Sequence, residues 1–167
     1  MHRVRTSEQA PTIDTALFRR VMGRFASGVT VITAEADGDV RGMTANAVMS
    51  GSLDPPLIII SVAKRAVMHS YLVAAGRFAV NILCAGQQEI ANHFAGRSLA
   101  AYAPKFAYIG NIPTLQGVRT VITAKTIAMH ECGDHTIFIG HILTMSMDDS
   151  PPLVYHAGKF GALPSGV

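Results

Sequence analysis

Hydrophobic residues follow a helical spacing near the start of the chain. Apolar residues recur at every fourth position from Ile13 to Phe25, which predicts an amphipathic helix over residues 12–25. Either Thr12 or Asp14 can cap the start of this helix, because both side chains carry an oxygen that accepts from a backbone N–H.

The pattern then changes to one typical of strands. Residues 29–35 and 40–47 are β-rich and flank the turn sequence ADGDV, so we expect them to form a hairpin. Residues 57–63, with the sequence LIIISVA, are continuously apolar and largely β-branched. This run predicts a strand that is covered on both faces.

The remainder of the chain predicts more strands and two short helices. The helices are expected over residues 66–75, ending at Gly76, and over residues 87–95. Residues 99–112 are mixed and turn-rich. Further strands are expected at 77–83, 118–130, 135–147 and 152–156.

Together these elements predict a mainly β protein with flanking helices. The strands are not separated by regular helical crossovers, which argues against a doubly wound parallel sheet and favours an antiparallel barrel. Neither an internal repeat nor a linker is visible in the sequence. We therefore expect residues 12–167 to form one domain and residues 1–11 to form a disordered N-terminal arm.

Composition narrows the class of protein. Of 167 residues 49% are hydrophobic and 15% are charged, which implies a large core or apolar surface that is buried in an oligomer. The net charge is +3, and the lysines and arginines are scattered along the chain. They form no basic stripe of the kind that would predict nucleic-acid binding.

The longest apolar runs have the length of a strand, which predicts no membrane span, and the N-terminus does not resemble a secretory signal. Cys84 and Cys132 form no CxxC motif, so we expect two buried thiols in a reducing cytoplasm.

The first candidate binding segment is Thr44-Ala45-Asn46-Ala47, at the end of a predicted strand. Its small side chains would let a flat heteroaromatic ring approach closely, while its amide and backbone groups could hydrogen-bond the edge of that ring. The alternative is a polar strand end that binds nothing.

The second candidate segment, SVAKR, runs from Ser61 through Val62 to Lys64 and Arg65. A hydroxyl and two cations lie just before a predicted helix, and this combination suits a phosphate group. A solvated strand end is the alternative. In the later helix predicted over residues 87–95, Phe94 is expected to be a core residue that could also form the wall of a pocket.

A third segment, HECGDHTIFIGHI, begins at His130 and is dense in metal-ligating residue types. Its spacing matches no structural zinc pattern, so we predict no metal site. His135, which follows Gly133 and Asp134, is better interpreted as a polar group at the rim of a pocket. A histidine in a surface turn is the alternative.

Five segments resemble, in order, the flavin reductase-like family of FMN-binding split-barrel proteins. They are FRRVMGRFASGVTVITA, GMTANAVMSGSLDPPLIIISVAKR, GRFAVNILCAGQQEIANHFAG, GDHTIFIGHI and PLVYHAGKFGAL, and they cover nearly the whole chain from Phe18 to Leu163. The resemblance implies a six-stranded antiparallel split barrel with Greek-key character in a homodimer. It also implies an NAD(P)H-dependent enzyme that passes hydride from NADH or NADPH to FMN or FAD. Reduced flavin would reach a flavin-dependent monooxygenase by diffusion.

The resemblance also implies roles for individual residues. The segment Thr44–Ala47 would line the flavin ring, and Ser61, Val62, Lys64 and Arg65 would hold its ribityl and phosphate end. Phe94 would close part of the pocket. Asp134 and His135 would lie on the nicotinamide side, with His135 positioning the nicotinamide rather than acting as a base. The family usually has a serine where this chain has Ala47, so flavin retention and the choice between FMN and FAD stay open.

Three other functions stay open at this point. The chain could be a flavin- or haem-binding split-barrel carrier or sensor without turnover, because fold does not fix function. It could be a metal-dependent enzyme that uses the cluster after His130. It could also be a split-barrel oxidase that acts on a small molecule such as a pyridoxamine phosphate, although no separate substrate motif is visible.

Overall fold

The structure is a computed structural model that describes residues 12–97 and 102–163. The arm expected over residues 1–11 lies outside the described residues. The helices are α1 (Thr15–Met22), α2 (Val67–Ala75) and α3 (Gln88–Phe94). The strands are β1 (Ser27–Gly28), β2 (Thr30–Ala36), β3 (Asp39–Ala45), β4 (Val48–Leu53), β5 (Pro56–Ala63), β6 (Arg77–Ile82), β7 (Phe106–Ile109), β8 (Ile112–Leu115), β9 (Thr120–Cys132), β10 (His135–Ser146), β11 (Leu153–His156) and β12 (Lys159–Ala162).

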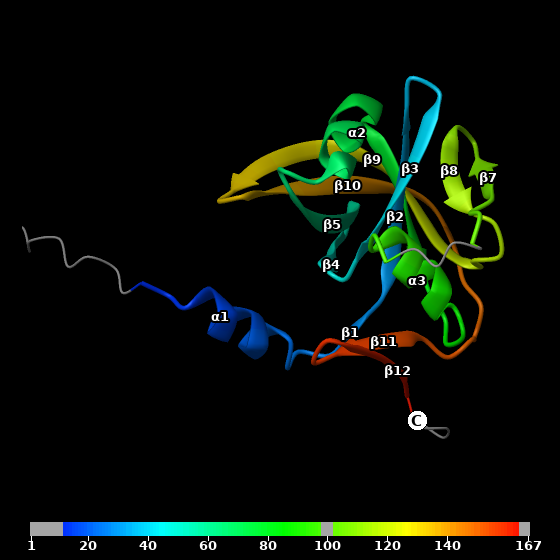
Figure 1. Cartoon of the computed structure of the whole chain (residues 1–167). Helices are drawn as coiled ribbons and strands as arrows, with labels where there is room; N and C mark the ends of the chain where they lie inside the picture. Colours follow the sequence, from blue (N-terminus) through cyan, green and yellow to red (C-terminus); the bar gives the residue numbers. More distant parts are fainter. Residues whose placement is uncertain (1–11, 98–101, 164–167) are drawn as a thin grey trace, which may run out of the picture.

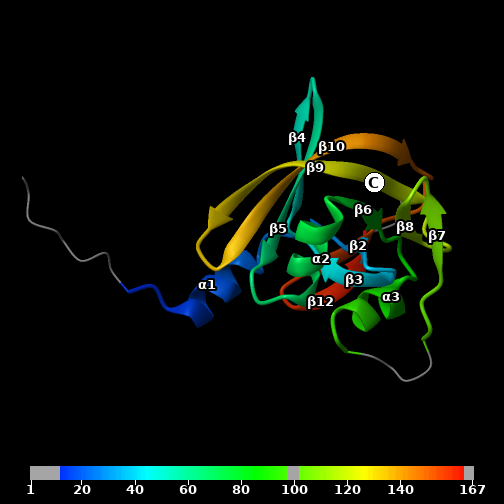
Figure 2. The same cartoon turned by 90° about the horizontal axis from the view of Figure 1, so that it is seen from above.

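An antiparallel sheet organises the molecule, in the order β3-β2-β6-β9-β10-β5-β4 (Figure 1). The sheet has seven strands where the resemblance implies six, and β4 lies at its edge in a hairpin with β5. The register shifts between Ser50 and Ser52, where a Cβ on Gly51 would lie 3.1 Å from Ile59. Figure 2 shows this hairpin projecting away from the helices.

The start of α1 and the end of α2 lie at capping residues that the sequence predicted. The Asp14 side chain accepts a hydrogen bond from the Ala16 N–H at 2.8 Å, so Asp14 rather than Thr12 caps α1. Helix α2 ends at Gly76, whose φ of 60° lies in the left-handed region that glycine adopts without strain. The sequence pattern did not predict strands β1, β4 and β12 or the β7–β8 hairpin.

Strand β2, rather than β5, has both of its faces covered. The side chains of Ile32 and Ala34 join one hydrophobic cluster beneath α2, and those of Val29 and Val31 join another beneath α3 and β8. Strand β5 instead alternates between buried and half-buried side chains, so the prediction that both of its faces are covered is wrong. The physical reason is that β8 packs against β2 and β6 and its coverage does not extend across the sheet to β5.

A buried polar network ties the β7–β8 hairpin to the main sheet. The fully buried Asn81 amide donates to the Val31 carbonyl at 2.9 Å and to the Thr33 hydroxyl at 3.0 Å. Its carbonyl oxygen accepts from the Leu115 N–H at 2.8 Å, and the Thr33 hydroxyl donates to the Pro113 carbonyl at 2.6 Å. These bonds join backbone groups of β8 to side chains of β2 and β6.

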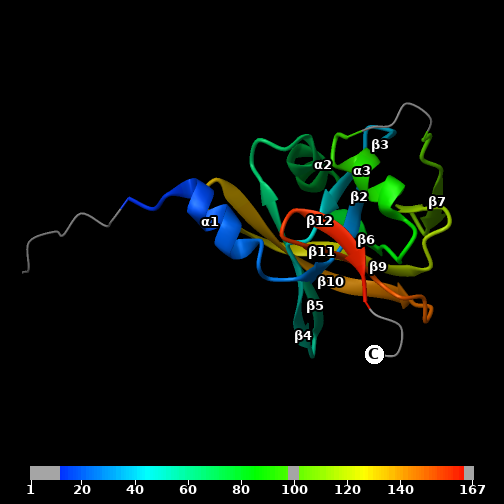
Figure 3. The same cartoon turned by 60° about the horizontal axis from the view of Figure 1, so that its bottom comes forward.

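Helix α1 lies outside the sheets in all views (Figures 1–3). It buries no side chain, and its apolar residues Leu17, Phe18, Val21 and Met22 are 54–59% exposed. Exposed apolar side chains also occur on the described parts of β4, β9 and β10. Cys132 is exposed at the end of β9, so the expectation of two buried thiols is wrong for this residue.

Candidate functional site

Pairing of β5 with β10 brings two of the candidate segments together. Ala63 lies opposite His135 and Ser61 lies opposite Ile137. Beyond the end of β5, the Lys64 N–H donates to the Asp134 carbonyl at 2.9 Å. The segments SVAKR and GDH, which are 70 residues apart in sequence, therefore form one site at the end of the sheet.

The alternation of β5 divides its residues between two faces. Side chains of residues directly paired in an antiparallel sheet share a face, so Ser61, Ala63 and His135 lie on the same side. Val62 points to the other side, is 1% exposed and belongs to the core cluster beneath α2. Only the backbone of Val62 is available to a ligand at this site.

The first candidate segment reaches the same place through its backbone. The Ser61 N–H donates to the Ala47 carbonyl at 3.1 Å, at the point where β4 begins to pair with β5. Asn46 and Ala47 lie between β3 and β4 and are exposed. The chain therefore places the backbone of Ala47 beside the Ser61 end of β5, without the hydroxyl that a serine would add at position 47.

A hydrogen bond orients His135. Its Nδ1 lies 2.7 Å from Oδ1 of Asp134. A carboxylate only accepts, so Nδ1 of His135 donates this hydrogen bond. The hydrogen bond and charge of His135 lower the pKa of the Asp134 carboxyl, with a smaller contribution from Arg65. Asp134 is therefore ionised at neutral pH and holds the imidazole in one orientation.

The two cations of this site have different surroundings. The Lys64 Nζ lies 3.4 Å from Oε1 of Glu131, which is almost fully exposed. Such a surface pair contributes little stability, so an anion can replace the carboxylate at small cost. Arg65 is exposed at the start of the turn that precedes α2.

Thr44, Ala45 and Asn46 line a cavity of about 180 Å³, which we call the β3 cavity. The Thr44 hydroxyl donates to the Ala91 carbonyl at 2.7 Å and so fixes the end of β3 to α3. Other residues that line the β3 cavity are Val29, Ala95, Arg97, Tyr155 and Phe160. The small side chains of Ala45 and Ala95 give it the kind of lining that a flat ring requires.

Phe94 packs against β3 next to the β3 cavity. Its ring packs directly over Gly42, where an added Cβ would lie only 2.4 Å from a ring carbon. The ring also contacts His93 edge-on, with centroids 4.9 Å apart. The structure therefore places Phe94 against β3, next to Ala95, which does line the cavity.

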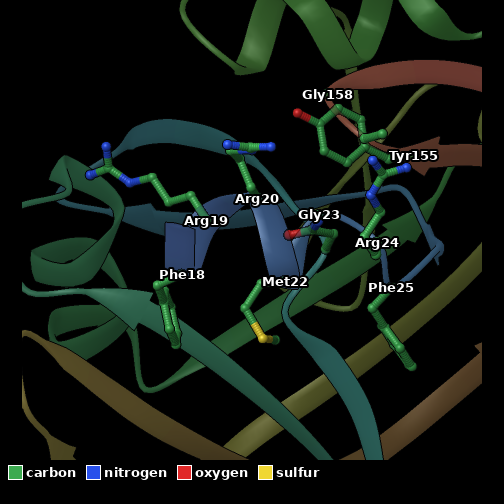
Figure 4. Close-up of a pocket in the computed structure, with 11 residues that line it drawn as sticks. Phe18, Arg19, Arg20, Met22, Gly23, Arg24, Phe25, Tyr155 and Gly158 are labelled. Atoms are coloured by element: carbon green, nitrogen blue, oxygen red, sulfur yellow. The ribbon is translucent and has the colours of Figure 1, made fainter. Parts of the chain in front are cut away.

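A larger cavity of about 590 Å³ adjoins the β3 cavity, and Asn46 and Tyr155 line both. We call it the arginine cavity because Arg19, Arg20 and Arg24 contribute to its walls (Figure 4). The sequence pattern did not single out these residues or Tyr155. Arg20 and Arg24 lie four positions apart on a predicted helix, and this spacing is the sequence signal that could have identified them.

The structure thus separates the predicted site residues into two groups. Thr44, Ala45 and Asn46 line the β3 cavity, whereas Ser61, Lys64, Arg65, Asp134 and His135 line neither that cavity nor the arginine cavity. Ala47 joins the two groups through its hydrogen bond with Ser61.

Two other features bear on the alternatives. Within residues 12–97 and 102–163, no three His, Cys, Asp or Glu side chains are arranged to hold a metal ion. No helix in the same ranges has the length and apolarity needed to cross a membrane.

Comparisons with known proteins agree on one family. The model of the flavin reductase like domain matches residues 22–164. An NADH-dependent flavin reductase from Rhodococcus is 36% identical over 93% of this chain and 90% of its own length. The reductase component of 4-hydroxyphenylacetate 3-monooxygenase from Thermus thermophilus is 39% identical over 83% of this chain and 89% of its own. The solved structure of flavin reductase PheA2 superposes with a TM-score of 0.88 at 37% identity, covering 92% of this chain and 100% of that one.

Proposed function

Because the chain belongs to the flavin reductase-like family, we propose that it is an NADH-dependent flavin reductase that supplies reduced flavin to a partner monooxygenase. One observation in the structure carries this proposal. The pairing of β5 with β10 places the cations that suit a flavin phosphate next to the oriented histidine that suits a nicotinamide. The predicted split-barrel fold is confirmed by the superposition on PheA2.

The residues present fit a flavin, either FMN or FAD. Ala45 and Ala95 leave room for a flat ring, and Ser61, Lys64 and Arg65 offer a hydroxyl and two cations for a phosphate. When bound, the flavin supplies the acceptor for the hydride of the reduced nicotinamide. The protein's own contribution is to hold the two rings at near contact, which explains why no paired carboxylates or catalytic triad are needed.

We further propose that His135 positions the nicotinamide and that Asp134 orients His135. The Asp134–His135 pair favours the reductase over a carrier, because a carrier needs no nicotinamide site. NADH is the preferred reductant in this proposal, following the Rhodococcus relative.

Steady-state turnover tests the proposed function directly. Purified protein is mixed with NADH or NADPH and with FMN, FAD or riboflavin, and oxidation is followed at 340 nm. We expect flavin-dependent oxidation with at least one flavin. If no flavin supports turnover, the reductase proposal fails. A bound flavin that NADH and NADPH do not bleach would instead indicate a carrier.

Replacement of His135 with alanine is expected to raise the KM for NADH about tenfold, while the Kd for flavin changes less than about twofold. The reason is that the side chain is assigned to the nicotinamide and not to the flavin. Flavin fluorescence gives the Kd and initial rates give the KM. His130→Ala serves as the control, because His130 is an exposed histidine on the same hairpin. Equal losses for both ligands would contradict the assigned role.

Replacement of both Lys64 and Arg65 with alanine is expected to weaken FMN binding about tenfold and to leave riboflavin binding unchanged. The two ligands differ only in the phosphate that these cations are proposed to contact. Arg77→Ala with Lys125→Ala removes the same charge from a cross-strand pair on β6 and β9. Equal weakening of FMN and riboflavin would remove Lys64 and Arg65 from the phosphate site.

We also propose that residues 12–167 form one domain and that the protein is a homodimer. Exposed apolar side chains on α1 and the half-buried face of β5 support the dimer, because a second copy would cover them. Light scattering at several protein concentrations measures the assembly. A stable monomer at micromolar concentration would contradict the homodimer.

A cytoplasmic location stays a prediction, supported by two cysteines that form no disulfide with each other.

A further inference from the structure

We infer that His69 is a positioning residue for His135. Through its contact with Thr136 it fixes the start of β10, and with it the direction in which the His135 side chain points. This inference rests on the proposed function and deepens it, because it concerns how the nicotinamide side of the site is held in place. His69 lies on α2 and is assigned to no ligand itself.

A hydrogen bond joins α2 to β10. Nε2 of His69 lies 2.9 Å from the hydroxyl oxygen of Thr136, the residue that follows His135. The Thr136 side chain is buried, so loss of either partner leaves a polar group that water reaches poorly. The His69 ring also meets the ring of Phe138 edge-on, with centroids 5.5 Å apart. Two contacts of one side chain therefore connect the helix to β10, and Figure 1 shows α2 beside the β9–β10 hairpin.

The residue that precedes His135 is tied to the same part of the chain. The Lys64 N–H donates to the Asp134 carbonyl at 2.9 Å, and the His69 N–H donates to the Ala66 carbonyl at 2.9 Å. Lys64, Ala66 and His69 belong to one continuous stretch that runs from the end of β5 into α2. Both chain neighbours of His135 are thus held by this single stretch.

His135 lies where the sheet ends. Its pairing with Ala63 is at the last register position between β10 and β5, and residues 132–134 beyond it are exposed. The ends of strands open more readily than their interiors. A side-chain contact at Thr136, one residue further into the strand, therefore has a large share in keeping the end of β10 in place.

The contact leaves the ligand side of His135 free. Successive residues of a strand point to opposite faces. Thr136 pairs with Val62, whose side chain lies in the core cluster beneath α2, whereas His135 shares the other face with Ser61. His69 therefore acts on the backbone of β10 from the core side. This separation assigns it to positioning rather than to catalysis.

Replacement of Thr136 with valine removes the hydroxyl and keeps the shape of the side chain. We expect it to raise the Kd for NADH, measured by equilibrium dialysis without flavin, about fivefold, while the Kd for riboflavin changes less than about twofold. Thr136→Ser keeps the hydroxyl, so its Kd for NADH is expected to stay within about twofold of the unmodified protein. The matched control is Thr123→Val, which removes a buried hydroxyl bonded to Thr144 on the same hairpin.

Three outcomes of these measurements would overturn the inference. The first is an unchanged Kd for NADH in Thr136→Val. The second is an equal loss in Thr136→Ser, which would assign the effect to packing of the methyl group. The third is an equal loss in Thr123→Val or for riboflavin, which would indicate that the hydrogen bond only stabilises the fold.

A double substitution tests whether His69 and Thr136 act through one bond. We expect His69→Leu alone to raise the Kd for NADH about fivefold, and His69→Leu with Thr136→Val to raise it about fivefold as well, because the second change removes nothing further. Losses that multiply in the double variant would show two independent effects and would contradict the positioning role.

NMR of the histidine rings gives a measurement without ligand. The signal of His135 is assigned by its absence from His135→Ala. We expect this signal to shift in Thr136→Val and in His69→Leu and to stay in place in Thr123→Val. A His135 signal that does not move in Thr136→Val would overturn the inference. A failure of the proposed function would be seen separately, in unmodified protein that oxidises neither NADH nor NADPH.

Discussion

Replacement of Asn81 with leucine is expected to lower the free energy of unfolding by about 3 kcal/mol. Leucine has the same branched arrangement of side-chain heavy atoms but can neither donate to the Val31 carbonyl nor accept from the Leu115 N–H. The Leu115 N–H would stay buried without this acceptor, which costs about 1–3 kcal/mol, whereas the Val31 carbonyl keeps its pairing with the backbone of residue 81. The fold is expected to remain, since the surrounding apolar clusters are unchanged.

Urea unfolding followed by circular dichroism measures this change, and the slope of the transition shows whether the unfolded state has changed as well. Thr33→Val gives an intermediate point, because it removes the single bond to the Pro113 carbonyl together with an acceptor for Asn81. Asn46→Ala is the matched control on an exposed asparagine. A loss no larger for Asn81→Leu than for this control would show that the network does not stabilise the hairpin.

The second large effect is expected from Gly42→Ala. The new Cβ would lie 2.4 Å from a ring carbon of Phe94, a distance at which the ring must move. Displacing Phe94 shifts α3 and the bond between the Thr44 hydroxyl and the Ala91 carbonyl. We expect a loss of about 2 kcal/mol of stability from overpacking and about tenfold weaker flavin binding, because α3 carries one wall of the β3 cavity.

A double substitution separates the steric cause from others. Adding Phe94→Leu to Gly42→Ala makes room for the methyl group, so part of the stability is expected to return, and the coupling between the two sites gives the interaction energy. Gly161→Ala is the matched control, because a Cβ there meets no atom within 4 Å. Additive losses in the double variant would contradict a steric origin. Unchanged flavin affinity in Gly42→Ala would remove the α3 wall from the flavin site.

Local features of the fold were predictable from the sequence. Asp14 and Gly76 mark helix ends through chemistry that acts within a few residues, and both predictions are confirmed. Strand β4 was not predicted, because Met49, Ser50 and Gly51 do not form an apolar run. These residues form a strand through hydrogen bonds with β5. Hydrogen bonding with a partner strand cannot be predicted from the sequence of the paired segment alone.

The site shows the same division between local and long-range information. The types of residue in SVAKR and GDH suggested a phosphate and a nicotinamide, but the register that joins Ala63 to His135 exists only in the sheet. The face on which each residue lies also depends on that register. Val62 was grouped with its neighbours as a ligand contact, whereas the structure turns its side chain into the core. The arginine cavity needed the contact between Gly23 and Ala157, which are 134 positions apart.

The isolation of α1 has an evolutionary consequence. A segment that contributes no side chain to the core can change its sequence with little effect on folding, so selection acts on it mainly through what it contacts. Helix α1 supplies the charge of the arginine cavity, while the β3 cavity and the end of β5 belong to the sheet. The sequence of this one short helix can therefore change while the barrel beneath it stays the same.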